Sequence, residues 1–351
     1  MIKKIIYLSN TRPDYSVNAV PIKGLQENGV EVLSLHLKIN IRNLVGLTKL
    51  YWKNRENFDL IMAGWDSPDL VIFASLMSGK KVIYNAALSV YERLIVSRKL
   101  ASRFSIKAFY YWFLDFVAVR LADLTMVETG HQAGYFKKIF KVSGKKIYHA
   151  WTGVDGGEFF YDPTIVKFGI FTVLFRGAFM PEAGVEYVIK AAKILEGKNI
   201  KFIVIGGGIL LEKTKELINE LKPANLELVT DFMPREKLRE TMQKCHLSLG
   251  QLSDHDRLSR TIPHKAYESL AMKLPYLTAS NAGILELLKS GETCITCEPA
   301  NAESLAEKII WAKDNLQELE RIAGNGYKLY CNQLVSHVLA KNLLDRIKDL
   351  Y

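Results

Sequence analysis

The sequence predicts an α/β protein made of two successive units, each with a parallel β-sheet covered by helices. Apolar runs of strand length alternate with helix-compatible stretches, and the alternation starts afresh after a Gly-rich break at 153–163. With 351 residues, 49% of them hydrophobic, the chain can form two cores. We assign residues 1–160 to a first domain and 161–351 to a second, and leave open that the C-terminal helix crosses back to the first.

The first half opens with an apolar run over 3–9, which predicts a buried strand. A polar loop over 10–16 and a helix over 20–29 follow, and Gly29 provides the helix stop. Further strands, each separated from the next by a helix-compatible stretch, are expected at 30–37, 59–65, 81–86 and 124–129.

The second half repeats this rhythm. Strands are expected at 171–177, 201–208, 226–232, 246–252 and 275–280. Helices are expected at 185–197, 210–222, 235–245 and 263–272, followed by a long helical region over 302–349. Because ligands of such sheets bind at the carboxyl ends of the strands, we expect an active site there, in a cleft between the two domains.

Signals for targeting and for metal binding are weak. The longest apolar stretch, 108–119, contains Asp115 and is shorter than the roughly 20 residues that cross a bilayer, and the first residues lack the pattern of a secretory signal. The few cysteines fit a reducing compartment, so we expect the chain in the cytoplasm. Cys294 and Cys297 have metal-like spacing, but no second ligand pair follows, so we expect structural thiols and no metal.

The positive charge lies mostly in the first half. The net charge is +10, and residues 1–160 hold 22 Lys and Arg against 13 Asp and Glu. Within that half, 91–123 interleaves basic residues with aromatic ones, which is typical of an interfacial membrane surface. The alternative is that the aromatic residues pack inside while the basic residues form a solvated face. We expect no nucleic acid, because no recognised motif accompanies the charge.

Three contiguous glycines, Gly206, Gly207 and Gly208, follow the strand at 201–208. A dinucleotide fingerprint needs G-x-G-x-x-G at the start of the next helix, and this spacing is absent. The glycines therefore predict a tight strand exit beside a ligand cleft, with Gly207 at the ligand.

The segment 257–288 contains the strongest chemical signal. Pro263 suits the first turn of a helix, whose free backbone N–H groups attract phosphate, and basic residues surround it. Lys265 and Glu268 share one helical face, where the carboxylate is placed to accept hydrogen bonds from two sugar hydroxyls. The alternative is an ordinary solvated ion pair. The residues we expect to bind the ligand here are Arg257, Arg260, Pro263, His264, Lys265 and Glu268.

Segments along nearly the whole chain resemble retaining glycosyltransferases of the GT-B architecture, in the group 1 or family 4 class. The resemblance is carried by 176–195, 231–250 and 262–280 in the second half and by 22–32, 120–129 and 153–155 in the first. It implies two Rossmann-like domains whose parallel sheets face each other across a cleft. It also implies a nucleotide diphosphate sugar as donor, and neither a cofactor nor a metal; the acidic run at 254–256 is a metal-binding alternative.

The departures from the family pattern concern charge. Arg260 stands where the family usually has the first of two glutamates, Glu268 being the second, and Ala178 and Ala183 stand where it has the Arg and Lys of the phosphate loop. The resemblance therefore implies that Glu268 holds the ribose, while Arg176, Arg260 and Lys265 neutralise the diphosphate. The absence of the family's usual residues at positions 178, 183 and 260 also motivates an alternative: a non-catalytic homologue that serves as a partner subunit of another glycosyltransferase.

The acceptor side is expected on the loops 10–16, 65–68 and 84–92 of the first half. We assign Arg12, Asp14, Tyr15 and Asp66 to acceptor binding. Asn85 stands where the family has an acidic residue or a histidine, and Glu92 is a second carboxylate of the same loop, so we name Asn85, Glu92 and Arg176 as catalytic. The expected function is retaining sugar transfer to a hydroxyl acceptor, lipid-linked at the inner face of a membrane, in the assembly of an envelope polysaccharide or glycan.

Overall fold

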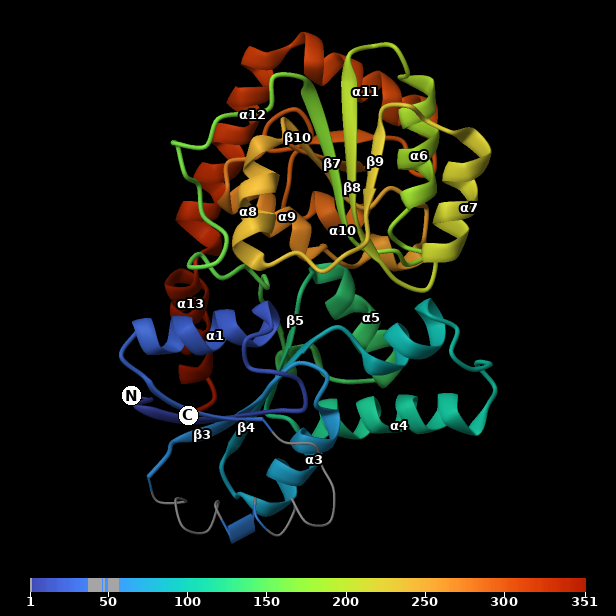
Figure 1. Cartoon of the computed structure of the whole chain (residues 1–351). Coiled ribbons are helices and arrows are strands. Elements are labelled where there is room, and N and C mark those ends of the chain that lie inside the picture. Colours follow the sequence, from blue (N-terminus) through green and yellow to red (C-terminus); the bar gives the residue numbers. More distant parts are fainter. Residues whose placement is uncertain (1, 37–45, 47, 50–56) are drawn as a thin grey trace. The chain divides into compact units, whose positions relative to one another are not determined.

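The computed structural model describes residues 2–36, 46, 48, 49 and 57–351 and divides the chain into two compact units (Figure 1). The amino-terminal unit comprises Met1–Asp155 and Gln333–Tyr351, and the carboxy-terminal unit comprises Gly156–Asn332. The break therefore lies slightly before the expected boundary at 160/161. The last helix belongs to the amino-terminal unit.

The amino-terminal unit has a six-stranded parallel sheet in the order β2-β1-β3-β4-β5-β6. Its strands are β1 (Lys4–Ser9), β2 (Glu31–His36), β3 (Leu60–Ala63), β4 (Lys81–Ala87), β5 (Leu124–Val127) and β6 (Ile147–His149). The first five confirm the sequence prediction. β6 has only three residues, too few for a hydrophobic period to be recognised.

Helices pack against this sheet from both ends of the chain. They are α1 (Ser16–Glu27), α3 (Pro68–Met77), α4 (Ile106–Leu121), α5 (Gly130–Phe140) and α13 (Ser336–Lys348), with the π-helix η1 (Glu92–Ser97) and the 3-10 helix η2 (Gly144–Lys146). α13 lies directly on α1, so closely that a Cβ atom at Gly24 would be 2.1 Å from the Ser336 carbonyl oxygen. This contact holds the returning chain end on the first unit.

α1 begins earlier than predicted and continues through Pro21. Proline lacks the N–H that would bond to the Val17 carbonyl one turn earlier, which normally breaks or kinks a helix. Here the side-chain amide of Asn85 on β4 donates to the Val17 oxygen at 2.9 Å. Gly29 has a φ of 78° just after the helix, as expected of a helix stop.

The carboxy-terminal unit has a second six-stranded parallel sheet in the order β12-β11-β10-β7-β8-β9. Its strands are β7 (Phe171–Ala178), β8 (Ile200–Gly207), β9 (Leu226–Val229), β10 (Leu247–Leu249), β11 (Tyr276–Ala279) and β12 (Ile295–Cys297). The strand pattern of the second half is thus confirmed, apart from the short edge strand β12, which the sequence analysis missed.

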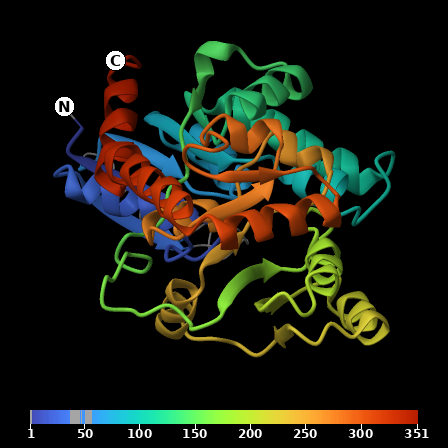
Figure 2. The same ribbon diagram turned by 90° about the horizontal axis from the view of Figure 1, so that it is seen from above.

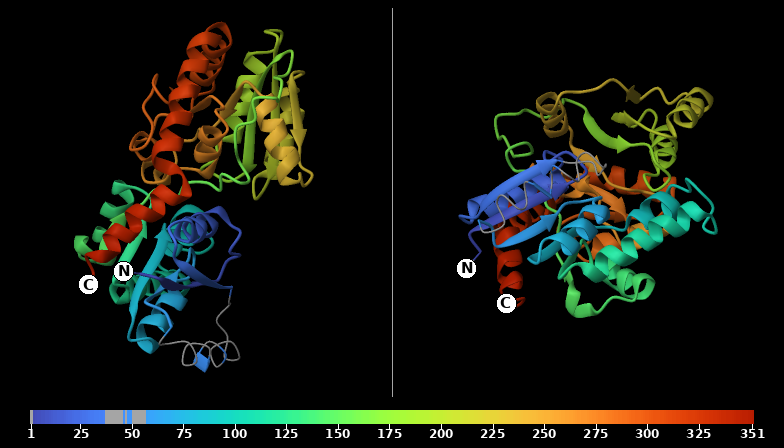
Figure 3. Two further views of the ribbon diagram at one scale, coloured as in Figure 1. Left: turned by 90° about the vertical axis from the view of Figure 1, so that its left-hand side faces the viewer. Right: turned by 90° about the horizontal axis from the view of Figure 1, so that it is seen from below.

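The helices of this unit are α6 (Val185–Ile194), α7 (Leu211–Leu221), α8 (Arg235–Lys244), α9 (His264–Ala271), α10 (Ala282–Leu285), α11 (Ala302–Asp314) and α12 (Leu316–Leu329), with the 3-10 helix η3 (Asp256–Ser259). Figures 2 and 3 show them from other directions. The expected helical region over 302–349 is confirmed, and it divides into α11, α12 and α13, with the π-helix η4 (Tyr330–Leu334) joining the last two. α6, α11 and the strands enclose a core that includes Val173, Phe175 and Phe202.

Candidate active site

The side chains of Arg176 and Glu268 form an ion pair at the carboxyl end of the second sheet. Arg176 is near the end of β7 and Glu268 lies one turn inside α9. Their side chains are only 15% and 7% exposed, and burial lowers the pKa of Arg176 to about 10. A buried pair of this kind stabilises little by itself, because desolvation of both charges opposes their attraction. The geometry therefore concentrates charge at the edge where parallel sheets bind ligands.

Lys265, on the same helix as Glu268, is a second buried cation at this site. Its Nζ atom donates to the carbonyl of Gly250 at 3.3 Å and lies 4.1 Å from the ring centre of Phe175. Burial, and after it the charge of Arg176, lowers the pKa of Lys265 to about 7. The ammonium form is therefore disfavoured until an anion arrives beside it.

The glycine-rich exits of β7 and β8 pack closely against each other beside these charges. A Cβ atom at Gly206 would lie 2.0 Å from the carbonyl oxygen of Gly177, and both glycines have positive φ. The Phe179 N–H donates to the Gly207 oxygen at 2.8 Å. The tight strand exit is confirmed. A Cβ atom at Gly177 would lie 3.7 Å from the Cε atom of Lys265, so the absence of a side chain at Gly177 leaves this space open beside the lysine.

The two other arginines expected at this helix start have acidic partners. Arg257 pairs with the buried Glu182 at 2.7 Å, which ties the loop before α9 to the loop after β7. Arg260 pairs with the exposed Asp256 at 2.7 Å. Arg257 is thus a structural link in this structure, whereas an incoming anion can draw Arg260 away from a solvent-exposed carboxylate.

The start of α9 differs by one residue from the sequence prediction. Pro263 is the N-cap with extended backbone and His264 is the first helical residue. Burial lowers the pKa of His264 to about 4, so its imidazole is neutral at pH 7. His264 can therefore offer hydrogen bonds but no charge.

Acidic and thiol groups near this edge are dispersed. Asp254 is exposed and Asp256 is engaged by Arg260. Cys294 and Cys297 are buried free thiols. In the described ranges, no three His, Cys, Asp or Glu side chains gather closely enough to hold a metal ion.

In the amino-terminal unit, the two residues expected to be catalytic are held inside the fold. Asn85 is buried and satisfies the Val17 carbonyl that Pro21 leaves without a donor. Glu92 is fully buried and accepts a hydrogen bond from the Gln132 side chain at 2.7 Å. The structure therefore gives both residues structural roles rather than open positions; a catalytic role for either stays a prediction.

The residues assigned to acceptor binding lie on loops at the carboxyl ends of β1 and β3. Arg12 and Asp14 form an exposed pair at 2.6 Å. Tyr15 lies 6.5 Å from Trp65 between ring centres, and Asp66 is paired with Arg93.

The sequence analysis placed Trp65 on an expected acceptor loop without naming it as a site residue, and it did not assign Arg93 to this cluster. The Arg93 guanidinium lies 5.4 Å from the Trp65 ring centre. Tyr15, Trp65, Asp66 and Arg93 thus form one patch from two loops and the π-helix η1. The aromatic residue directly before Asp66 was the available signal.

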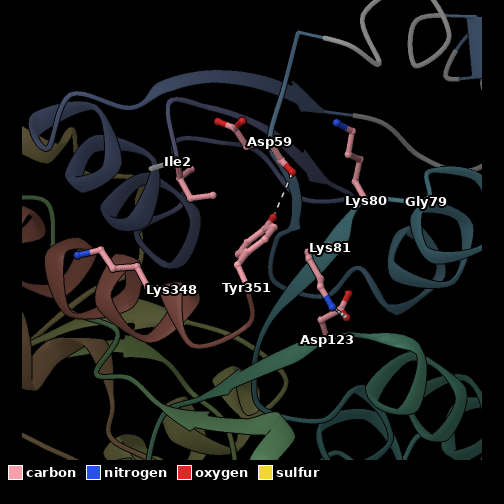
Figure 4. Close-up of a pocket in the computed structure, with 8 residues that line it drawn as sticks. All are labelled: Ile2, Asp59, Gly79, Lys80, Lys81, Asp123, Lys348 and Tyr351. Atoms are coloured by element: carbon pink, nitrogen blue, oxygen red, sulfur yellow. Dashed lines mark hydrogen bonds and ion pairs between the residues drawn. The ribbon is translucent and has the colours of Figure 1, made fainter.

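A cavity of about 650 Å³ opens at the other edge of the same sheet, where the strands begin (Figure 4). The Tyr351 hydroxyl donates to the Asp59 carbonyl at 3.3 Å, and Lys81 pairs with Asp123 at 3.0 Å. The first contact joins Tyr351 to the start of β3, and the second joins the starts of β4 and β5. Because parallel sheets bind ligands at their carboxyl edge, this cavity is not the candidate site.

The sequence of the carboxy-terminal unit identifies its family. Residues 168–329 match the sequence model of glycosyl transferases group 1, and this stretch contains Arg176, Lys265 and Glu268. Residues 168–329 form a group 1 glycosyl transferase domain.

Curated relatives match this chain over part of its length. It is 26% identical over 159 residues to 2-deoxystreptamine N-acetyl-D-glucosaminyltransferase of Niallia circulans, covering 43% of this chain and 39% of that one. It is also 26% identical over 171 residues to an uncharacterized glycosyltransferase of Methanocaldococcus jannaschii, covering 49% and 45%. The chain thus spans less than half the length of these two relatives.

Likeness to solved structures extends over the whole chain. HepE of Anabaena, solved in complex with UDP and glucose, superimposes with a TM-score of 0.73 at 15% identity, covering 99% of this chain and 100% of that one. Identity this low shows the fold alone. The chain has the GT-B fold, as predicted.

Proposed function

We propose that this protein transfers a sugar from a nucleotide diphosphate sugar to a hydroxyl acceptor with retention of anomeric configuration. The observation that carries the proposal is the buried group of Arg176, Lys265 and Glu268 at the carboxyl edge of a group 1 glycosyl transferase domain. HepE, which shares the fold, binds UDP and glucose, and this supports the donor class.

Each charged group has a part in donor binding. Glu268 accepts hydrogen bonds from the ribose hydroxyls, and Arg176 and Lys265, with Arg260, neutralise the diphosphate. Gly207, Pro263 and His264 bring backbone and a neutral imidazole close to it. The charge that Ala178 and Ala183 do not supply comes instead from the end of β7 and from α9. This buried replacement favours the enzyme over the alternative of a non-catalytic partner subunit.

The transfer step needs little from the amino-terminal unit. The bond between the anomeric carbon and the leaving phosphate oxygen breaks, and a bond to the acceptor oxygen forms on the same face. The acceptor proton passes to the leaving phosphate. The protein then mainly orients the reactants and stabilises the departing diphosphate, so the burial of Asn85 and Glu92 is compatible with turnover.

The proposal is tested with the purified protein alone. We expect it to hydrolyse or transfer from one member of a panel of UDP-, GDP-, ADP- and dTDP-sugars. The nucleotide that binds should raise the melting temperature, since a ligand at 100 times its Kd stabilises by about 2.7 kcal/mol. Binding without turnover by the protein alone, with turnover restored by a second glycosyltransferase, would favour the partner-subunit alternative.

Chelators should leave this activity unchanged, because side chains and the α9 start supply the positive charge that a metal would otherwise supply. The measurement compares turnover without EDTA, with EDTA, and with EDTA followed by an excess of Mg²⁺. Loss in EDTA and recovery in Mg²⁺ would instead assign the acidic run at 254–256 to a metal.

The acceptor, we propose, is lipid-linked and is met at the cytoplasmic face of an anionic membrane, during assembly of an envelope polysaccharide or glycan. The support comes from α4, on which Ile106, Phe109, Tyr110 and Phe113 are each at least half exposed. Their spacing places them on one side of the helix, and we call them the exposed stripe. None of the helices in the described ranges is long and apolar enough to span a bilayer.

The exposed stripe supports the proposed membrane contact of the aromatic run. Trp112 and Phe116 pack against the core, as the alternative required, but the stripe does not. Phe104, just before the helix, is fully exposed. Arg103 and Lys107 flank these apolar groups, and an amphipathic surface with basic flanks is suited to the boundary between head groups and acyl chains.

We expect the protein to sediment with vesicles of phosphatidylglycerol and phosphatidylcholine at low salt. Changing Arg98, Lys99, Arg103 and Lys107 to glutamine should abolish sedimentation, since each basic residue near an anionic surface contributes about 1 kcal/mol. The matched control changes four exposed lysines elsewhere on the same unit, Lys137, Lys138, Lys141 and Lys145. Equal loss in both variants, or no binding by the unaltered protein, would favour a soluble acceptor.

A further inference from the structure

The first residues of the carboxy-terminal unit, 156–163, form a strap along α8 (Figure 1). The Glu158 side chain pairs with Arg235 at the start of that helix. The Asp162 N–H donates to the side-chain oxygen of Gln243, near its end, at 2.7 Å. Because the strap is attached to α8 at two points, the course of the backbone between Glu158 and Asp162 is fixed relative to that helix.

Two neighbouring phenylalanines of the strap contact different arginines. Phe160 is 38% exposed, and its ring centre lies 4.1 Å from the guanidinium of Arg239 on α8. Phe159 is only 6% exposed, and its ring centre lies 5.7 Å from the guanidinium of Arg176. The strap thus places one aromatic ring on a helix surface and the other against the buried arginine of the candidate site.

We infer that Phe159 is a positioning residue that holds the Arg176 guanidinium toward the donor diphosphate; the inference rests on the proposed function. The Arg176 guanidinium contacts both the Glu268 carboxylate and the Phe159 ring. When Glu268 turns its oxygens to the ribose hydroxyls, its hold on Arg176 weakens. The aromatic face then remains, and a cation–π contact in a desolvated place is strong enough to restrict a long side chain.

The test measures how tightly UDP, GDP, ADP and dTDP bind, each compared with its own nucleoside. Phe159→Leu should lower the affinity for the diphosphate that binds best by about fivefold. The affinity for the matching nucleoside should not change, since the cation–π contact acts only through Arg176. Phe159→Tyr keeps the aromatic face and should bind like the unaltered protein. Phe160→Leu, which removes the matching contact to Arg239, is the control and should have no effect.

A double-mutant comparison separates positioning from general packing. In an Arg176→Gln background, Phe159→Leu should cause no further loss of diphosphate binding. The inference is overturned by the same fivefold loss in that background, or by unchanged binding in Phe159→Leu alone. If the unaltered protein binds none of the four diphosphates, the proposed function itself is wrong. Should Phe159→Leu not fold, Phe159→Met offers similar volume without an aromatic face.

Discussion

Replacing Glu268 by alanine is expected to lower donor-dependent turnover at least tenfold. Each hydrogen bond between a carboxylate and a ribose hydroxyl is worth about 1.5–3 kcal/mol, and tenfold corresponds to about 1.4 kcal/mol. The structure adds a second cost, since Arg176 loses its buried partner and an uncompensated charge remains beside the donor site.

The comparison variants for Glu268 separate these two costs. Glu268→Gln keeps the shape and one acceptor oxygen, so it should retain more activity than Glu268→Ala. Glu212→Ala removes an exposed carboxylate of α7 that pairs with Lys215, and it should leave turnover and melting temperature unchanged. Near-normal kinetics in a folded Glu268→Ala variant would remove the ribose assignment.

Lys265→Met is expected to reduce nucleoside diphosphate affinity at least tenfold while raising the melting temperature. Removing a buried cation from a phosphate can cost several kcal/mol of binding. In the free protein, however, the depressed pKa of about 7 means that the folded state disfavours the ammonium form. That penalty is fully present below pH 7 and fades as pH rises toward the ordinary lysine pKa, so the gain in stability should be largest at low pH.

The same pKa predicts that donor binding takes up a proton. At pH 8 the free Lys265 amine is mostly neutral, and an anionic diphosphate beside it favours the charged form. Titration calorimetry in buffers of different ionisation enthalpy should therefore show proton uptake at pH 8, less at pH 6, and none for this group in Lys265→Met.

A matched control for Lys265 is Lys190→Met on α6, where an exposed lysine lies 5.8 Å from the Tyr187 ring centre. It should change neither affinity nor proton uptake. Equal proton uptake at pH 8 by Lys265→Met and by the unaltered protein would show that a different group titrates.

The sequence by itself determined the repeated strand and helix pattern, and with it the two parallel sheets. Buried strands such as β1 and β8 are long apolar runs, so their period is visible without knowledge of the partner strand. The same local signals predicted the tight exit at Gly206–Gly208 and the helix that carries Lys265 and Glu268. The exceptions, β6 and β12, have three residues each and lie at sheet edges.

The tertiary structure decided which charged and polar groups meet. Four cations were visible near the predicted site, but only packing showed that Arg176 pairs with Glu268 whereas Arg257 pairs with Glu182. Asn85 stood at the end of a strand, where a catalytic role was reasonable. Its hydrogen-bond partner is the Val17 carbonyl on α1. That carbonyl lacks a backbone donor because Pro21 lies inside the helix, whereas local rules would place a proline at a helix end.

The direction of side chains was decided in the same way. Apart from Asp115, the run 108–119 is apolar around the whole helix, so its hydrophobic period does not show which side faces the core. Packing on the sheet buries Ala118 and leaves Phe109 and Phe113 outside. Local sequence limits the conformation of each segment, but the partner of a buried charge and the buried face of a uniformly apolar helix depend on residues far away along the chain.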